Sequence, residues 1–244
     1  MPNQAQFDPT TFDHYAALYE ELMALPYRQH LELPTLKHLF GDLNGLRVLD
    51  FGCGPGVISR WLHHLGAAVT GYDISEGMIE YARQRAEHEQ TDIQYQSDLS
   101  QLKEQSFDLI LAVYVMPYAS DLNSLNSMTQ SMAQLLKPQG RLISLMMHPA
   151  FHTDPNYYRD FGLRLIELSP RQDASPVTLN ICHPPHDIEI TAYYWSAQTL
   201  EQTLKQAGFA HISWPNLQGQ DFPVALQPYY DQPHAAIIEA IKAK

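Results

Sequence analysis

A glycine loop that directly follows a short apolar run most constrains the fold of this chain. Residues 48–51 (Val-Leu-Asp-Phe) are typical of a buried strand, and Gly-Cys-Gly-Pro-Gly follows at once. Without a Cβ, glycine lets the backbone approach a ligand closely and adopt positive φ. The next residues continue as a helix, whose first N–H groups and positive dipole end face whatever the loop holds. The pattern predicts a ligand bound at a strand–loop–helix unit.

The residues that follow the loop distinguish between the nucleotide-binding motifs. A dinucleotide fingerprint needs a third glycine for close helix–strand packing, and Val57 occupies that position. A Walker loop would continue with Lys and Ser or Thr, whereas this chain has Val57 and Ile58. Residues 67–72 form a second apolar run that closes on Asp73. A carboxylate at that strand end can accept hydrogen bonds from both ribose hydroxyls.

Three further candidate strands follow in order. Residues 93–96 close on Ser-Asp-Leu at 97–99, where a carboxylate could bind the exocyclic amine of an adenine. Residues 107–113 form the fourth strand, and residues 140–146 form the fifth after a helix breaker at 137–140. Strands that alternate with helices in this way predict a parallel sheet with helices on both faces.

These pieces together resemble the class I S-adenosylmethionine-dependent methyltransferases, over roughly residues 10–148. The matching segments are 49–56, 69–83, 97–99, 107–118 and 135–145. The resemblance implies an α/β, Rossmann-like fold: a seven-stranded, mostly parallel sheet with helices on both faces. It also implies S-adenosyl-L-methionine as cofactor and methyl transfer by in-line displacement.

The resemblance further implies which residues hold the cofactor. Gly52, Cys53 and Gly54 would contact its methionine part, and Asp73 its ribose. The remaining cofactor residues, for the carboxylate, the adenine and the sulfonium, would be Tyr19, Arg28, Ile74, Met78, Asp98, Leu99, Ala112, Val113 and Tyr114.

Four of these assignments have a structural alternative. Asp73 could instead be a helix N-cap ahead of residues 75–78, and Asp98 could be a turn carboxylate. Tyr19 could be ordinary packing, and Arg28 could be a solvated surface charge.

The chain is predicted to be one domain, 1–244, with an N-terminal helical lid at 1–44. The lid would contain helices at 12–25 and 29–40, separated at Pro26. The cofactor-binding core would follow at 45–148.

A substrate-side β insertion is predicted at 149–195, after the fifth strand. Alternation and β-branching favour strands at 163–167, 177–181 and 188–194. The C-terminal segment, 196–244, would complete the sheet. Its elements would be a helix with Ser196 as its N-cap that ends at Gly208, and strands at 211–214 and 235–241. The alanines of 235–241 equally favour a helix, and the resemblance to the family, whose sheet an antiparallel strand closes, implies the strand.

Ligands of open α/β sheets bind outside the carboxyl ends of the strands. The predicted acceptor residues are therefore Tyr114, Met116, Tyr118, His148 and His152. His148, at the end of the fifth strand, is the candidate general base, with Tyr118 as a second catalytic candidate. A histidine that merely caps the strand before Pro149 is the alternative.

Charge excludes several partners. The chain has 244 residues and a net charge of −12, from 15 Lys+Arg against 27 Asp+Glu, with no basic run. Nucleic acids and anionic membranes bind clustered Lys and Arg, so neither is expected as a partner. The two cysteines, Cys53 and Cys182, give no disulfide framework, which is typical of a reducing cytoplasm. No metal site and no membrane span are predicted.

The predicted function is methyl transfer to a nitrogen or oxygen of a small heteroaromatic molecule. Residues 26–28, 33–36 and 113–118 also resemble bacterial secondary-metabolite methyltransferases, including the toxoflavin-type N-methyltransferases. Two alternatives are a non-catalytic cofactor-binding protein and a nicotinamide-dependent oxidoreductase. Val57 in the third glycine position argues against the second.

Overall fold

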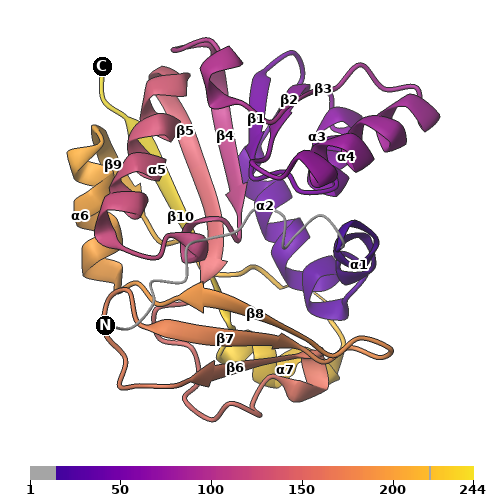
Figure 1. Cartoon of the computed structure of the whole chain (residues 1–244), viewed down its shortest axis with the longest axis vertical. Helices are drawn as coiled ribbons and strands as arrows, with labels where there is room; N and C mark the ends of the chain where they lie inside the picture. Colours follow the sequence, from indigo (N-terminus) through magenta and orange to yellow (C-terminus); the bar gives the residue numbers. More distant parts are fainter. Residues whose placement is uncertain (1–14, 220) are drawn as a thin grey trace.

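A twisted seven-stranded sheet forms the centre of the computed structural model, which describes residues 15–219 and 221–244 (Figure 1). Its strand order is β3-β2-β1-β4-β5-β10-β9. Neighbours pair in parallel except β10, which runs antiparallel to both β5 and β9. The strands are β1 (Arg47–Phe51), β2 (Ala68–Tyr72), β3 (Gln94–Gln96), β4 (Phe107–Val113), β5 (Leu136–Met147), β9 (Phe209–Ser213) and β10 (Ala235–Lys242). The predicted fold class is thus confirmed.

Helices cover both faces of this sheet. The α-helices are α1 (Ala16–Leu22), α2 (Leu33–Phe40), α3 (Val57–His64), α4 (Glu76–His88), α5 (Leu122–Leu135), α6 (Ala197–Gln206) and α7 (Gln227–Asp231). Shorter helical turns are η2 (Arg28–Glu32), η3 (Leu99–Gln101), η4 (Met116–Tyr118), η5 (Arg159–Phe161) and η6 (Val224–Leu226). Among the described helices none is long and apolar enough to cross a bilayer.

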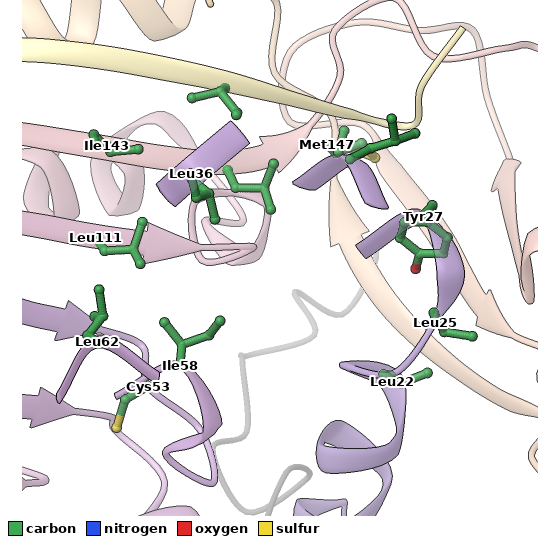
Figure 2. Packing of buried hydrophobic residues seen from close by; sticks show 14 of the residues in the cluster. Leu22, Leu25, Tyr27, Leu36, Cys53, Ile58, Leu62, Leu111, Ile143 and Met147 are labelled. Carbon is green, nitrogen blue, oxygen red and sulfur yellow. The ribbon is translucent and has the colours of Figure 1, made fainter. Parts of the chain in front are cut away.

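The two-residue period of β4 divides the core into two layers. Leu109 and Leu111 pack toward α1–α4, whereas Ile110 and Ala112 pack toward α5 and α6. Figure 2 shows Leu36 of α2 beside Leu111 and Ile143 of the sheet. A parallel strand buried on both faces needs apolar residues at consecutive positions, which is why residues 107–113 show no polar alternation.

A second, antiparallel sheet lies at the carboxyl ends of β4 and β5 (Figure 1). Its three strands are β6 (Leu163–Glu167), β7 (Pro176–Ile181) and β8 (Ile188–Tyr193), close to the predicted bounds. The turn between β7 and β8 reaches α1, where His186 Nε2 lies 2.7 Å from a carboxylate oxygen of Glu21. The small sheet and α1 are therefore joined at the same edge of the large sheet.

Two predicted boundaries were wrong. The fifth strand, predicted to begin at residue 140 after a helix breaker at 137–140, begins at Leu136, immediately after α5 ends at Leu135. Gln139 takes φ +64°, and the register shifts between Phe107 and Leu109, so the extra residues are accommodated within the strand. The second lid helix begins before residue 29, because a π-helical turn at Arg28–Glu32 runs directly into α2. Residues 12–14 of the first predicted helix lie outside the described residues.

Ser75 is expected to contribute to the stability of α4. Its hydroxyl, 1% exposed, accepts a hydrogen bond from the N–H of Met78 at 3.1 Å. Removing such a cap costs about 1 kcal/mol, so Ser75→Ala is expected to lower the free energy of unfolding by that amount in urea. Ser75→Thr keeps the hydroxyl and should lose less. Equal losses in both variants would contradict the capping role.

Candidate active site

The glycine loop is held by the strand next to it and by Asp73. The N–H groups of Gly52 and Cys53 donate to the carbonyl oxygen of Tyr72 at 2.7 and 2.9 Å. The N–H of Gly54 donates to Asp73 Oδ2 at 2.8 Å. Because Asp73 comes directly after β2, one carboxylate fixes the shape of a loop that follows β1.

Asp73 also accepts a hydrogen bond through its other oxygen, from the N–H of Ser75 at 2.9 Å. The side chain that caps α4 is Ser75, which answers the alternative that Asp73 is the N-cap. Asp73 instead joins the loop to the start of the helix.

A cavity of about 420 Å³ opens above this loop. Its size is within the range of small-molecule and cofactor sites. Twelve of the residues predicted from the sequence line it: Tyr19, Arg28, Gly52, Cys53, Gly54, Asp73, Ile74, Met78, Leu99, Val113, Tyr114 and Tyr118. Residues from α1, η2 and four strand ends thus meet at one cavity.

Five predicted residues do not line the cavity: Asp98, Ala112, Met116, His148 and His152. Ala112 and Met116 are fully buried in the layer that faces α5. Asp98 accepts hydrogen bonds from the N–H and the hydroxyl of Ser100, both at 2.8 Å, as the carboxylate of a turn.

The two histidines are engaged in local turns. His148 Nδ1 accepts from the N–H of Ala150 at 2.9 Å, and burial lowers the pKa of its imidazole. His152 Nδ1 accepts from the N–H of Asp154 at 3.0 Å, and its ring stacks on Tyr157 at 4.0 Å between centroids. A base role for His148 stays a prediction, and its geometry fits the strand-capping alternative.

One wall of the cavity was not predicted from the sequence. Ser124, Ser127, Met128 and Ser131 line it from α5. They are spaced three or four residues apart, so they lie on one face of α5. The three serines at this spacing are the feature of the sequence that could have indicated this wall.

Two helical segments cover the cavity. The hydroxyls of Tyr19 and Tyr118 lie 3.5 Å apart. The guanidinium of Arg28 lies 4.9 Å from the ring centroid of Tyr114 and donates to the sulfur of Met23 at 3.4 Å. Arg28 is therefore packed into the wall of the cavity, where it can still meet a carboxylate group of a ligand.

Burial changes the ionisation of two groups beside the loop. Asp50 is 1% exposed, and burial raises the pKa of its carboxyl to about 7, although Ser59 donates to it at 2.6 Å. Burial, with a further contribution from Asp50, raises the pKa of the Cys53 thiol well above its usual range. Cys53 is therefore a neutral thiol at neutral pH and no nucleophile.

A cluster of buried polar side chains adjoins the cavity next to Tyr114. The hydroxyls of Tyr114 and Tyr229 both donate to Glu32 Oε1, at 2.6 and 2.8 Å. The same hydroxyls lie 3.1 Å from Nε2 and 2.8 Å from Nδ1 of His234. Tyr114 has φ +56°, a left-handed conformation that costs a bulky residue about 1–3 kcal/mol and is common at functional sites.

Comparison with known proteins identifies the family. Residues 48–140 match the methyltransferase domain family. The chain is 40% identical over 103 residues to a ubiquinone biosynthesis O-methyltransferase of Coxiella burnetii, a match covering 41% of this chain and 43% of that protein. It is 30% identical over 182 residues to a demethylmenaquinone methyltransferase of Tropheryma whipplei, covering 73% and 72% of the two chains. The chain belongs to the S-adenosylmethionine-dependent methyltransferases.

The structure of this methyltransferase agrees with that assignment. It superposes on an S-adenosylmethionine-dependent methyltransferase of Mesorhizobium loti with a TM-score of 0.62 and 24% identity, covering 91% of this chain and all of the other. The chain matches less than half the length of the ubiquinone O-methyltransferase named above. The predicted family and cofactor are confirmed, which removes the oxidoreductase alternative. The narrower resemblance to toxoflavin-type enzymes is not confirmed.

The residues present fit this cofactor. A Cβ built on Gly54 would meet no atom within 4 Å, so the loop borders open space on the cavity side. Aromatic and apolar side chains, including Ile74, Met78 and Tyr72, continue the same cavity toward the ends of β2 and β3. A flat base and a flexible amino-acid chain can both be accommodated.

Proposed function

We propose that this protein transfers a methyl group from S-adenosylmethionine to an oxygen or nitrogen of a small aromatic molecule, with a phenolic oxygen favoured. The observation that carries the proposal is the continuity of one cavity from Gly54 and Asp73 to the rings of Tyr114 and Tyr118. Aromatic walls suit a flat acceptor. The named relatives act in ubiquinone biosynthesis and on demethylmenaquinone, which supports an acceptor related to quinones.

When bound, the cofactor supplies an already activated methyl group, so the protein mainly aligns the reactants and excludes water. Asp73 and the glycine loop would fix the ribose and the methionine part. Arg28, from a helical segment that covers the cavity, would neutralise the carboxylate of the cofactor. Tyr19 and Tyr118 would close the cavity. The acceptor would lie against Tyr114 and Tyr118, at the carboxyl end of β4.

Calorimetric titration with S-adenosylhomocysteine tests the cofactor part of this proposal, with NAD as the control. Micromolar binding corresponds to about −8 kcal/mol. Binding of S-adenosylhomocysteine without NAD binding supports the proposal, and the reverse overturns it. Transfer of labelled methyl from S-adenosylmethionine to a panel of catechols and aminophenols tests turnover. Tight cofactor binding without transfer to any acceptor would favour the non-catalytic alternative.

Asp73→Ala is expected to weaken the binding of S-adenosylhomocysteine by about 1.5–3 kcal/mol, or roughly 10- to 150-fold. The variant removes the proposed ribose acceptor and releases the N–H of Gly54, which Asp73 holds at 2.8 Å. Asp73→Asn is the matched control, because its amide oxygen can still accept from Gly54 while the charge is lost. Unchanged affinity in the alanine variant would contradict the ribose role.

A further inference from the structure

Four side chains beside the cavity close a ring of polar contacts. Glu32 Oε1 contacts the hydroxyls of Tyr114 and Tyr229, at 2.6 and 2.8 Å. The same two hydroxyls contact opposite nitrogens of His234, at 3.1 and 2.8 Å. Glu32, Tyr229 and His234 are 1%, 0% and 5% exposed. Of the four, only Tyr114 lines the cavity.

The number of protons in this ring is set by its geometry. Each of the four contacts needs one proton between its two electronegative atoms. Two tyrosine hydroxyls and a neutral imidazole bring three protons. An ionised Glu32 therefore leaves one contact in which two lone pairs face each other.

A fourth proton on Glu32 completes the ring without any net charge. Glu32 then donates to Tyr114, and Tyr114 donates to Nε2 of His234. The Nδ1–H of His234 donates to Tyr229, whose own proton is donated to Glu32. The ring therefore has room for one additional proton.

The surroundings assign this proton to the carboxyl group. Burial lowers the pKa of His234 to about 3, so the imidazole stays neutral. Burial also raises the pKa of Glu32, even though Arg28 and the two tyrosines oppose the shift. Arg28 Nε lies 3.9 Å from Glu32 Oε2, and neither atom has a hydrogen-bond partner among the described residues. The other titratable or charged groups that face the ring are Tyr27, Arg28, His148 and Tyr158.

We propose that this ring accepts the proton that the acceptor loses during methyl transfer, with Tyr114 as the entry point and Glu32 as the final holder. The proposal rests on the proposed function. As the acceptor oxygen or nitrogen forms its bond to the methyl carbon, the carbon–sulfur bond breaks and its electron pair stays on sulfur. The acceptor's proton moves to the oxygen of Tyr114, and the original Tyr114 proton moves to Glu32 Oε1. The proton returns to solvent through Tyr114 after the product leaves.

Infrared titration of the protein tests the ring without any acceptor. The C=O stretch of a protonated Glu32 is isolated by ¹³C-glutamate labelling and by comparison with Glu32→Gln. We expect this band to persist at pH values at which the exposed glutamates of the chain are already ionised, because burial raises the pKa of Glu32, and to disappear as the pH rises further. A Glu32 that ionises together with the exposed glutamates, or that keeps its proton throughout the pH range in which the enzyme is active, overturns the proposal. The labelled wild type gives this result even if Glu32→Gln does not fold.

Two matched tyrosine variants separate proton transfer from structural support. Tyr114→Phe and Tyr229→Phe each remove one hydroxyl that contacts both Glu32 and His234, but only Tyr114 lines the cavity. With a catechol as methyl acceptor, Tyr114→Phe is expected to lower kcat about 10²- to 10⁴-fold. Tyr229→Phe should lose at least about tenfold less, because the path from Tyr114 to Glu32 remains.

The pH profile provides the readout that a purely structural role would not change. In the wild type, kcat should rise with pH through the midpoint measured for Glu32, and Glu32→Gln should remove that rise. Binding of S-adenosylhomocysteine should stay within about threefold in Tyr114→Phe, because the substitution keeps the ring that lines the cavity and removes only the hydroxyl that contacts Glu32. Equal losses in the two tyrosine variants, or an unchanged pH profile in Glu32→Gln, overturn the proposal. If no catechol or aminophenol of the panel takes the methyl group, the proposed function fails, and the infrared titration of Glu32 alone tests the ring.

Discussion

Asp50→Asn is expected to remove a loss of stability that the wild-type protein suffers as the pH rises. The carboxyl of Asp50 is buried at the end of β1, and its pKa in the folded protein is about 7. In the unfolded chain an aspartate has a pKa of about 3.9. The folded protein therefore binds a proton that the unfolded chain releases between these two values.

The sign of the effect follows from this difference. Between about pH 4 and pH 7 the native state holds more protons than the unfolded state, so the free energy of unfolding falls as the pH rises. Above the folded pKa the loss is complete, at about 4 kcal/mol. Asparagine does not ionise and keeps a similar shape, and Ser59 remains available as a partner.

Urea denaturation of both proteins between about pH 5 and pH 8 checks this prediction. The stability of Asp50→Asn relative to wild type should increase by about 2.5 kcal/mol over that range. Both proteins share the other titrating groups, so the contributions of those groups to the pH dependence cancel in the difference. Parallel pH profiles would mean that Asp50 titrates with an ordinary pKa.

The core of the fold could be predicted because its signals are local. The run at 48–51 is apolar at every position except Asp50, and the chain must leave that strand through Gly52 and Gly54 because both take positive φ. Ser196 caps α6 as predicted, with its hydroxyl accepting from the N–H of Thr199 at 3.2 Å. Such features depend on a few adjacent residues, so the sequence displays them directly.

The ring beside the cavity could not be predicted, because its members come from four separate segments. Glu32 reads as a charged residue of a helix, and His234 as a residue before a strand. Only the tertiary fold brings α7 and the start of β10 against η2 and the end of β4. For the same reason His148 was a reasonable choice of base in the sequence. Its position at a strand end was visible, whereas the engagement of its Nδ1 by Ala150 was not.

The strand β5 shows a third limit of sequence reasoning. The helix breaker at 137–140 placed the start of the strand at residue 140, yet Pro138 and Gly140 both lie within the strand. Gln139 absorbs the irregularity by adopting φ +64°, and its side-chain amide donates to the carbonyl oxygen of Lys242 at 3.1 Å. Pairing with β10 begins directly after this irregular segment, at Arg141, and continues to Met147.

Gly52→Ala is expected to destabilise the fold by roughly 2–5 kcal/mol, from two separate costs. Gly52 has φ +76°, which costs an L-residue about 1–2 kcal/mol. A Cβ there would also lie 2.4 Å from Cγ2 of Val115, and relief of such an overlap costs about 1–3 kcal/mol. The loop cannot simply move away, because the N–H of Gly52 is bonded to the carbonyl oxygen of Tyr72 at 2.7 Å.

Gly54→Ala is the matched control, since Gly54 has φ +50° but a Cβ there meets no atom within 4 Å. Its unfolding free energy in urea should fall by only about 1–2 kcal/mol, the cost of the backbone conformation alone. Adding Val115→Ala to Gly52→Ala should recover part of the stability by removing the overlap. For binding of S-adenosylhomocysteine the order of the two glycine variants should reverse, with the larger loss in Gly54→Ala. Gly54→Ala places a methyl group in the open space of the cavity and should lose affinity for S-adenosylhomocysteine while staying folded. A folded Gly54→Ala with wild-type affinity would show that the cofactor does not lie against the loop at this position.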